Sequence, residues 1–149
     1  MKISIRSTIL AGVLLLLSTP AIAQNSEREA VDQVMQKMMR AFEAGDPNLI
    51  FEVLRRDGVV VGYSAPRGSM VTQTGEEWGS GFPGKPADDE ALRKRSYEIV
   101  DVTPNAAVVK VLLDYPMWDG VDYLALSKID GKWMIVSKSW SGQRKPSAP

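Results

Sequence analysis

Apolar side chains near the start of the chain recur at helical spacing. Ser26 and Glu29 have the spacing of a capping box, which is typical of the first turn of a helix. The apolar positions that follow are separated by three or four residues, as on one face of a helix: Val31, Val34, Met35, Met38, Met39 and Phe42. Gly45 suits the C-terminal cap of this helix, and Asp46-Pro47 indicates that a second helix begins there.

The second half of the chain has the pattern of consecutive β-strands. Four segments rich in β-branched and aromatic residues are separated by turn residues: 93–102, 106–115, 121–129 and 132–140. Asp130-Gly131 is the strongest turn signal and joins the last two segments into a hairpin. Between the helices and these segments, the pattern predicts a strand over Val59–Tyr63 and a short helix that begins near Thr74. Helices followed by antiparallel strands predict an α+β fold, with N-terminal helices packed on a mostly antiparallel sheet.

The segment 1–23 has the pattern of a secretory signal peptide. Two positive charges precede an apolar run from Ile9 to Leu17, and Ala21-Ile22-Ala23 provides a cleavage site of small residues. The run is shorter than the roughly 20 residues that a membrane-spanning helix needs. We therefore expect a periplasmic or secreted protein with no membrane attachment after cleavage. It would consist of one domain over 24–141 and a disordered tail over 142–149.

Composition narrows the chemistry of this domain. The chain has no Cys and no His, which excludes a Ser-His-Asp triad, thiolate chemistry and His-ligated zinc. We therefore expect neither a metal nor a cofactor. Lys2 and Arg6 leave with the signal peptide, so 16 of the 18 basic residues remain against 18 acidic residues. This balance argues against nucleic acid and anionic membranes as partners, because both attract basic patches.

Two stretches resemble a known superfamily. The sequence AFEAGDPNLIFEVL (Ala41–Leu54) resembles the helix–Gly–Asp–helix opening of nuclear transport factor 2-like proteins. The end of the chain, VVKVLLDYP followed by DYLALSKIDGKWMIVSKSW, resembles the last three strands of the branch named for lumazine binding. The resemblance extends from about Ala30 to Trp140. It implies a cone, in which a curved antiparallel sheet wraps around a long helix and leaves a pocket at its open end.

This superfamily includes ketosteroid isomerase, scytalone dehydratase and polyketide cyclases beside non-enzymatic binding modules, so the fold does not fix the function. The resemblance to the isomerase can be tested residue by residue. The position of its carboxylate base falls on Gly62, and that of its helix tyrosine falls on Met38. The third position, an Asp in the penultimate strand, matches Asp122. One match in three argues against that reaction and leaves Asp122 as a candidate acid.

The predicted hairpin indicates which side chains share a face with Asp122. A two-residue turn sets a register that places Asp122 opposite Ser139, with Ser137 on the same face. The candidate ligand-binding residues are then Tyr63, Trp78, Tyr115, Asp122, Ser137 and Ser139. Tyr63 and Trp78 suit either the rim of a pocket or the edge of the core. Asp122 is the candidate catalytic residue, and a structural role is the alternative.

The opposite face of the predicted hairpin is also largely apolar. In this register it holds Tyr123, Ala125, Met134, Val136, Lys138 and Trp140. An apolar outer face needs a cover, and a second copy of the chain is the simplest one, so we expect a homodimer.

Three functions fit these observations. The first is a small-molecule-binding cone domain whose pocket takes an apolar or aromatic ligand. The second is a metal-independent enzyme of the cyclase, isomerase or dehydratase type, in which Asp122 acts with Tyr63 or Tyr115. The third is a protein-interaction module that uses the outer sheet face. A pocket with a buried Asp122 would favour the first two, and a cone filled by side chains would favour the third.

Overall fold

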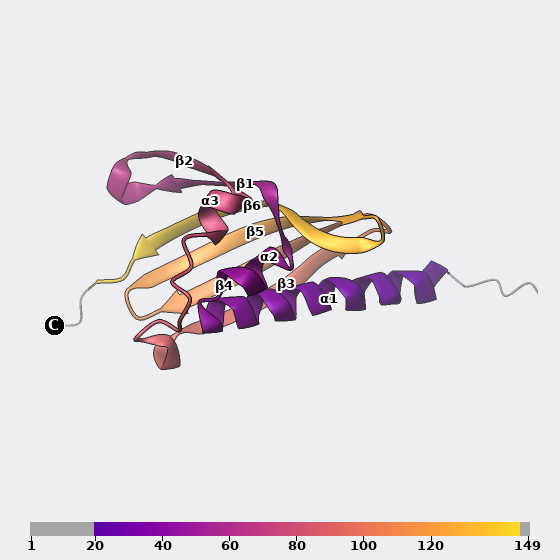
Figure 1. The fold of residues 1–149 in the computed structure, drawn as a ribbon, viewed down its shortest axis with the longest axis horizontal. Helices are drawn as coiled ribbons and strands as arrows, with labels where there is room; N and C mark the ends of the chain where they lie inside the picture. The colour runs from indigo at the N-terminus through magenta and orange to yellow at the C-terminus, as the bar shows by residue number, and fades with distance from the viewer. Residues whose placement is uncertain (1–19, 147–149) are drawn as a thin grey trace, which may run out of the picture.

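A computed structural model describes residues 20–146, in which one long helix lies along a six-stranded sheet (Figure 1). Most of the expected signal peptide lies outside the described residues, as do residues 147–149 of the expected tail. Within the described part of the chain, no helix is long and apolar enough to cross a membrane.

The described elements confirm the predicted α+β class. The helical elements are α1 (Pro20–Ala44), α2 (Pro47–Phe51), α3 (Gly75–Gly79) and two 3-10 turns, η1 (Ala65–Arg67) and η2 (Glu90–Leu92). The strands are β1 (Leu54–Ser64), β2 (Ser69–Thr74), β3 (Lys94–Val102), β4 (Ala106–Tyr115), β5 (Trp118–Ile129) and β6 (Lys132–Arg144). They form one curved sheet in the order β2-β1-β6-β5-β4-β3. Strands β1 and β6 run parallel, and the other neighbours run antiparallel.

Helix α1 begins earlier than the capping box predicts, at Pro20 rather than near Ser26. Glu27 ties this end of the helix to the hairpin of β5 and β6. Its carboxylate accepts hydrogen bonds from Nζ of Lys128 at 2.6 Å and from Nε1 of Trp133 at 2.8 Å. These bonds fix how α1 crosses the sheet.

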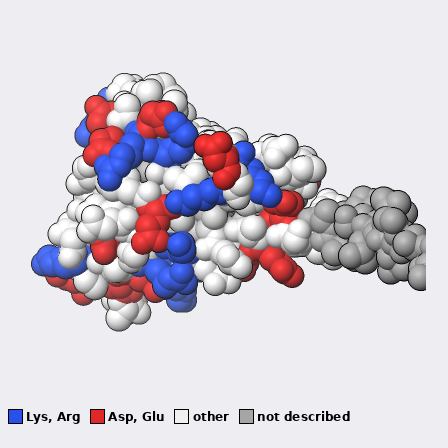
Figure 2. Space-filling view, turned by 45° about the vertical axis from the view of Figure 1, so that its right-hand side comes forward, with Lys and Arg blue, Asp and Glu red and all other residues white. Residues whose placement is uncertain are grey.

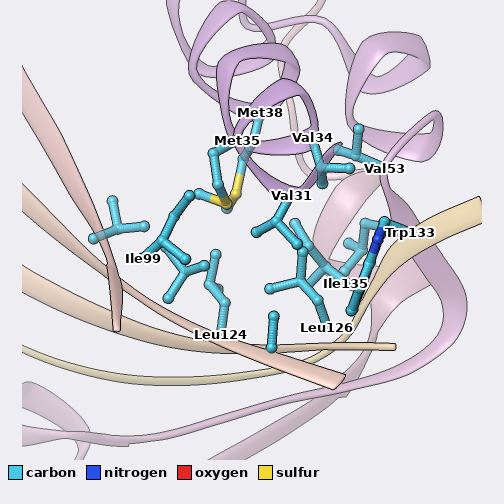
Figure 3. Packing of buried hydrophobic residues seen from close by; sticks show 14 of the residues in the cluster. Val31, Val34, Met35, Met38, Val53, Ile99, Leu124, Leu126, Trp133 and Ile135 are labelled. Carbon is cyan, nitrogen blue, oxygen red and sulfur yellow. The ribbon is translucent and has the colours of Figure 1, made fainter. Parts of the chain in front are cut away.

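The middle of α1 fills one end of the cone. Figure 3 shows Val31, Met35 and Met38 of α1 pointing toward Leu124 and Ile135 of the sheet. All five side chains are fully buried, which matches the apolar face predicted from the sequence. This end of the cone is therefore solid core.

The register of the β5–β6 hairpin differs from the prediction. The turn forms at Asp130-Gly131 as expected, with positive φ angles of 50° and 78°. A β-bulge then inserts Val136 as an extra residue, because Ala125 pairs with Ser137 while the next residue of β5 pairs with Ile135. One inserted residue turns every later side chain of the strand to the opposite face.

The bulge reverses the predicted faces of the residues of β6 that follow Val136. Asp122 pairs with Trp140 rather than with Ser139, and Lys138 and Trp140 lie on the concave face with it. Ser137 and Ser139 lie on the outer face. The sequence could not show this, because the pattern of β6 fits either register after residue 135.

Strand β6 also extends further than expected. It continues to Arg144 instead of ending at Trp140, so the first residues of the expected tail pair with β5 near Trp118. Gly142 and Gly62 leave room for two indole rings, because a Cβ atom at either position would overlap Trp118 or Trp140 respectively. Both rings thus pack across the open end of the sheet.

Charged side chains are mixed over the surface. Figure 2 shows Lys and Arg beside Asp and Glu on the face in view. Several form exposed ion pairs, such as Lys37 with Glu52 at 2.9 Å. Pairs of this kind contribute about 0–1 kcal/mol each, so they do little to hold the fold together.

Candidate functional site

A cavity of about 300 Å³ lies beyond the C-terminal end of α1. Gly45 ends the helix in the left-handed conformation, at φ 61°. The loop after α3 closes over this end, because the backbone N–H of Gly84 donates to the carbonyl oxygen of Gly45 at 2.7 Å. A Cβ atom at Gly45 would overlap the backbone of Lys85, so glycine permits this close approach. The loop thereby forms one wall of the cavity.

A buried ion pair forms the floor of the cavity. Nζ of Lys138 on β6 donates a hydrogen bond to Oδ2 of Asp122 on β5 at 2.6 Å. The two side chains are 7% and 3% exposed. Burial lowers the pKa of Lys138, and the negative charge of Asp122 opposes this effect without cancelling it.

Three aromatic rings form the wall between the helix and the loop. Phe42 stacks on Phe82 with ring centroids 5.7 Å apart, and Trp78 meets Phe82 edge-on at 5.2 Å. Trp78 is held by α3, which begins near Thr74 as predicted and has a capping box between Thr74 and Glu77. The amine of Lys138 lies 4.6 Å from the centre of the Trp78 ring, within reach of a cation–π interaction.

The opposite wall is formed by β3 and β4. Nε of Arg95 donates to the hydroxyl of Tyr115 at 2.8 Å, and its guanidinium also binds the carboxylate of Glu90. Burial acts to lower the pKa of Arg95, but the hydrogen bonds to Glu90 and Tyr115 act more strongly in the other direction, so its pKa is raised overall. Burial raises the pKa of Tyr115, although Arg95 acts in the other direction. Arg95 is thus a permanent cation, and Tyr115 stays neutral at physiological pH.

A second cavity, of about 150 Å³, lies on the far side of Trp78 and Leu113. Trp118 and Trp140 line it. The Asp122–Lys138 pair borders both cavities, so both spaces give access to the same two charges.

Three of the six candidate ligand-binding residues meet at the larger cavity: Trp78, Tyr115 and Asp122. Tyr63 does not line it and stands 53% exposed on β1. Ser137 and Ser139 are turned away from it by the bulge.

Sequence reasoning missed Lys138 and Arg95. Lys138 is a charged residue between Ser137 and Ser139, directly after the apolar run 133–136, and the unbulged register sends it to the outer face. Arg95 belongs to an Arg-Lys-Arg run that is typical of a solvated strand end, yet its side chain is only 6% exposed. No group of three or more Asp or Glu side chains within residues 20–146 is arranged to hold a metal ion.

Comparison with solved structures identifies the class of fold. An NTF2-like protein from Shewanella baltica OS155 superposes with a TM-score of 0.67 at 18% identity, covering 87% of this chain and 99% of that one. An NTF2-like protein from Silicibacter pomeroyi DSS-3 gives a TM-score of 0.66 at 16% identity, covering 80% and 98%. The chain therefore has the nuclear transport factor 2-like cone fold.

Sequence comparison identifies the family. Residues 26–141 match the model of the family described as "Putative lumazine-binding", and the chain belongs to this family. It is also similar to the aldolase FrzH of Cladobotryum sp, with 30% identity over 118 residues that cover 76% of this chain and 90% of the relative.

The buried pair generates a prediction about stability. Lys138→Met leaves the Asp122 carboxylate buried without its partner, and we expect the free energy of unfolding to fall by about 3–5 kcal/mol. The double variant Lys138→Met/Asp122→Leu should recover most of this loss, because an apolar replacement of a buried pair is often nearly neutral. Urea denaturation of both variants provides the measurement.

Lys37→Met is the matched control, because it breaks the exposed pair with Glu52. It should cost less than about 1 kcal/mol. A loss in Lys138→Met no larger than in this control would contradict the assigned burial of the pair.

Proposed function

We propose that this protein binds a small, flat organic molecule in the cavity at the C-terminal end of α1. The observation that carries the proposal is the aromatic wall of Phe42, Trp78 and Phe82 above the buried Asp122–Lys138 pair. Aromatic walls with a few convergent polar groups are typical of small-molecule sites. The open cavity and the buried Asp122 favour a ligand site over a module that acts only through its outer face.

The charges around the cavity suggest which polar groups the ligand carries. The lining contains four cationic side chains and one acidic one: Lys85, Arg93, Arg95, Lys138 and Asp122. The acids that pair with the two arginines, Asp89 and Glu90, do not line the cavity. A ligand with carbonyl or carboxylate oxygens would meet these donors. The family name makes lumazine, a flat heteroaromatic molecule with carbonyl oxygens, the first ligand to test.

The ligand proposal leads to a test with two aromatic residues. Trp78→Ala removes a ring from the wall, and we expect affinity for lumazine, or for any ligand that native mass spectrometry finds retained, to fall about tenfold. Tyr63→Ala is the control, because Tyr63 is an exposed aromatic residue outside the cavity. Titration calorimetry measures both. Equal losses in the two variants would place the ligand elsewhere.

A second candidate is catalysis at the same site. Its specific support is the position of Asp122, Lys138 and Tyr115 around one cavity, together with the similarity to a relative named as an aldolase. Buried titratable groups in a cavity suit proton transfer next to a carbonyl group. Such an enzyme would be metal-independent and would use Asp122 with Tyr115. Tyr63 is not available for this role, because it does not line the cavity.

We also propose that the protein is exported and that its mature form starts at Gln24. The support is the signal-peptide pattern of residues 1–23. Cleavage after Ala23 would leave the contacts of Glu27 with Lys128 and Trp133 in place. N-terminal sequencing of protein from the cell exterior or periplasm is expected to begin at Gln24. An intact N-terminus in the membrane fraction would contradict export by cleavage.

The outer sheet face supports the proposal of a homodimer, although of the residues that the sequence predicts there not all lie on it. Trp140 lies on the concave face and takes no part. The exposed apolar residues of the outer face are Val59, Tyr63, Val108, Leu112 and Tyr123, each between 44% and 53% exposed. An uncovered apolar face of this kind is typical of an interface.

The dimer proposal can be tested by a substitution that introduces one negative charge on the outer face. Tyr123→Glu places a carboxylate in the middle of the outer face and should convert dimers to monomers in light scattering. Leu92→Glu is the control, because Leu92 is 68% exposed but lies on η2, away from this face. A wild-type protein that is monomeric at micromolar concentration would contradict the dimer proposal.

A further inference from the structure

Lys138 differs from the other lysine at the cavity in the surroundings of its amine. The side chain of Lys138 is 7% exposed, whereas that of Lys85 is 73% exposed. Lys138 is held on β6 between Val60 of β1 and Leu124 of β5, both of which are fully buried. Lys138 therefore lines the cavity from a buried, apolar part of the sheet.

We propose that the amine of Lys138 forms an imine with a carbonyl group of the bound ligand, with Asp122 as the proton carrier. This step rests on the ligand site proposed above, and it makes Lys138 a catalytic nucleophile. The geometry supports it in two ways. Lys138 lines both cavities, and a carboxylate oxygen of Asp122 lies 2.6 Å from its Nζ atom.

The surroundings favour the reactive form of the amine. Only the uncharged amine attacks a carbonyl carbon, and desolvation increases the uncharged fraction. The pKa of Lys138 is lowered by burial. Trp78 covers one side of the amine at 4.6 Å, which limits access of water and leaves the cavity as the route for a ligand.

The reaction balances without any other reactant. The nitrogen lone pair attacks the carbonyl carbon, and Asp122 moves a proton from nitrogen to the carbonyl oxygen, which gives a carbinolamine. The nitrogen lone pair then forms the C=N bond as the C–O bond breaks. As this happens, Asp122 passes the second proton of the amine to the departing oxygen, which leaves as water. One amine and one carbonyl thus give one imine and one water.

Tyr115 and Arg95 provide donors for the carbonyl oxygen. The hydroxyl of Tyr115 accepts the hydrogen bond from Arg95, so its own O–H bond is free to donate elsewhere. Both residues line the larger cavity with Lys138. A carbonyl oxygen placed near them would be polarised, which makes its carbon easier to attack.

Reductive trapping tests the imine directly. The full mature chain is incubated at neutral pH with benzaldehyde and sodium cyanoborohydride, and intact mass and peptide mapping locate the benzyl groups. We expect labelling of Lys138 ahead of Lys85 and the surface lysines. Lys138→Arg should lose this adduct while it keeps a cation beside Asp122, and Lys85→Arg should retain it. Mapping of the wild-type protein gives the result even if Lys138→Arg folds poorly.

Ligand-observed NMR measures whether benzaldehyde binds when no reductant is present. This measurement distinguishes failure of the imine proposal from failure of the ligand-site proposal. Binding with no adduct on Lys138 would overturn the imine and leave the ligand site standing. Neither binding nor an adduct would overturn both proposals. An adduct on Lys138 whose formation is prevented by competing lumazine or by a retained ligand would support both.

Discussion

The bulge at Val136 is the constraint on which the site depends. It allows Ile135 and Lys138 to face the same side of the sheet although they are three residues apart in a strand. Ile135 completes the packed core, and Lys138 reaches the cavity. In a regular strand the same lysine would point to the outer face, and Asp122 would be buried without a cation. The bulge residue Val136 thus allows one strand to contribute both to the core and to the candidate site.

The length of α1 decides where the cone is hollow. Its buried side chains pack against the sheet as far as Ala41, and the helix ends at Ala44 with Gly45 as its cap. Beyond this point, aromatic residues from the end of α1, from α3 and from the loop after it line the space but do not fill it. A helix that continued further would occupy the cavity with its own side chains.

The buried charges at the floor suggest a site maintained for function. An apolar pair of similar volume would serve the fold equally well, because the cost of desolvating Asp122 and Lys138 offsets much of their attraction. The pair instead lies where two cavities meet, beneath the ring of Trp78. Proteins often retain such costly groups where activity needs them.

The sequence alone determined the α+β class, the buried face of α1 and the hairpin turn, because local spacing and turn chemistry encode these features. Asp122 became a candidate acid through the resemblance to ketosteroid isomerase. It also supported the resemblance to the family. Only the tertiary structure decided the partner of Asp122. The bulge is fixed by how β6 packs between β1 and β5, and a strand pattern cannot reveal an inserted residue. For the same reason Lys138 joined the site, while Ser137 and Ser139 left it. Arg95 joined it from β3, where it bonds to Tyr115 and Glu90.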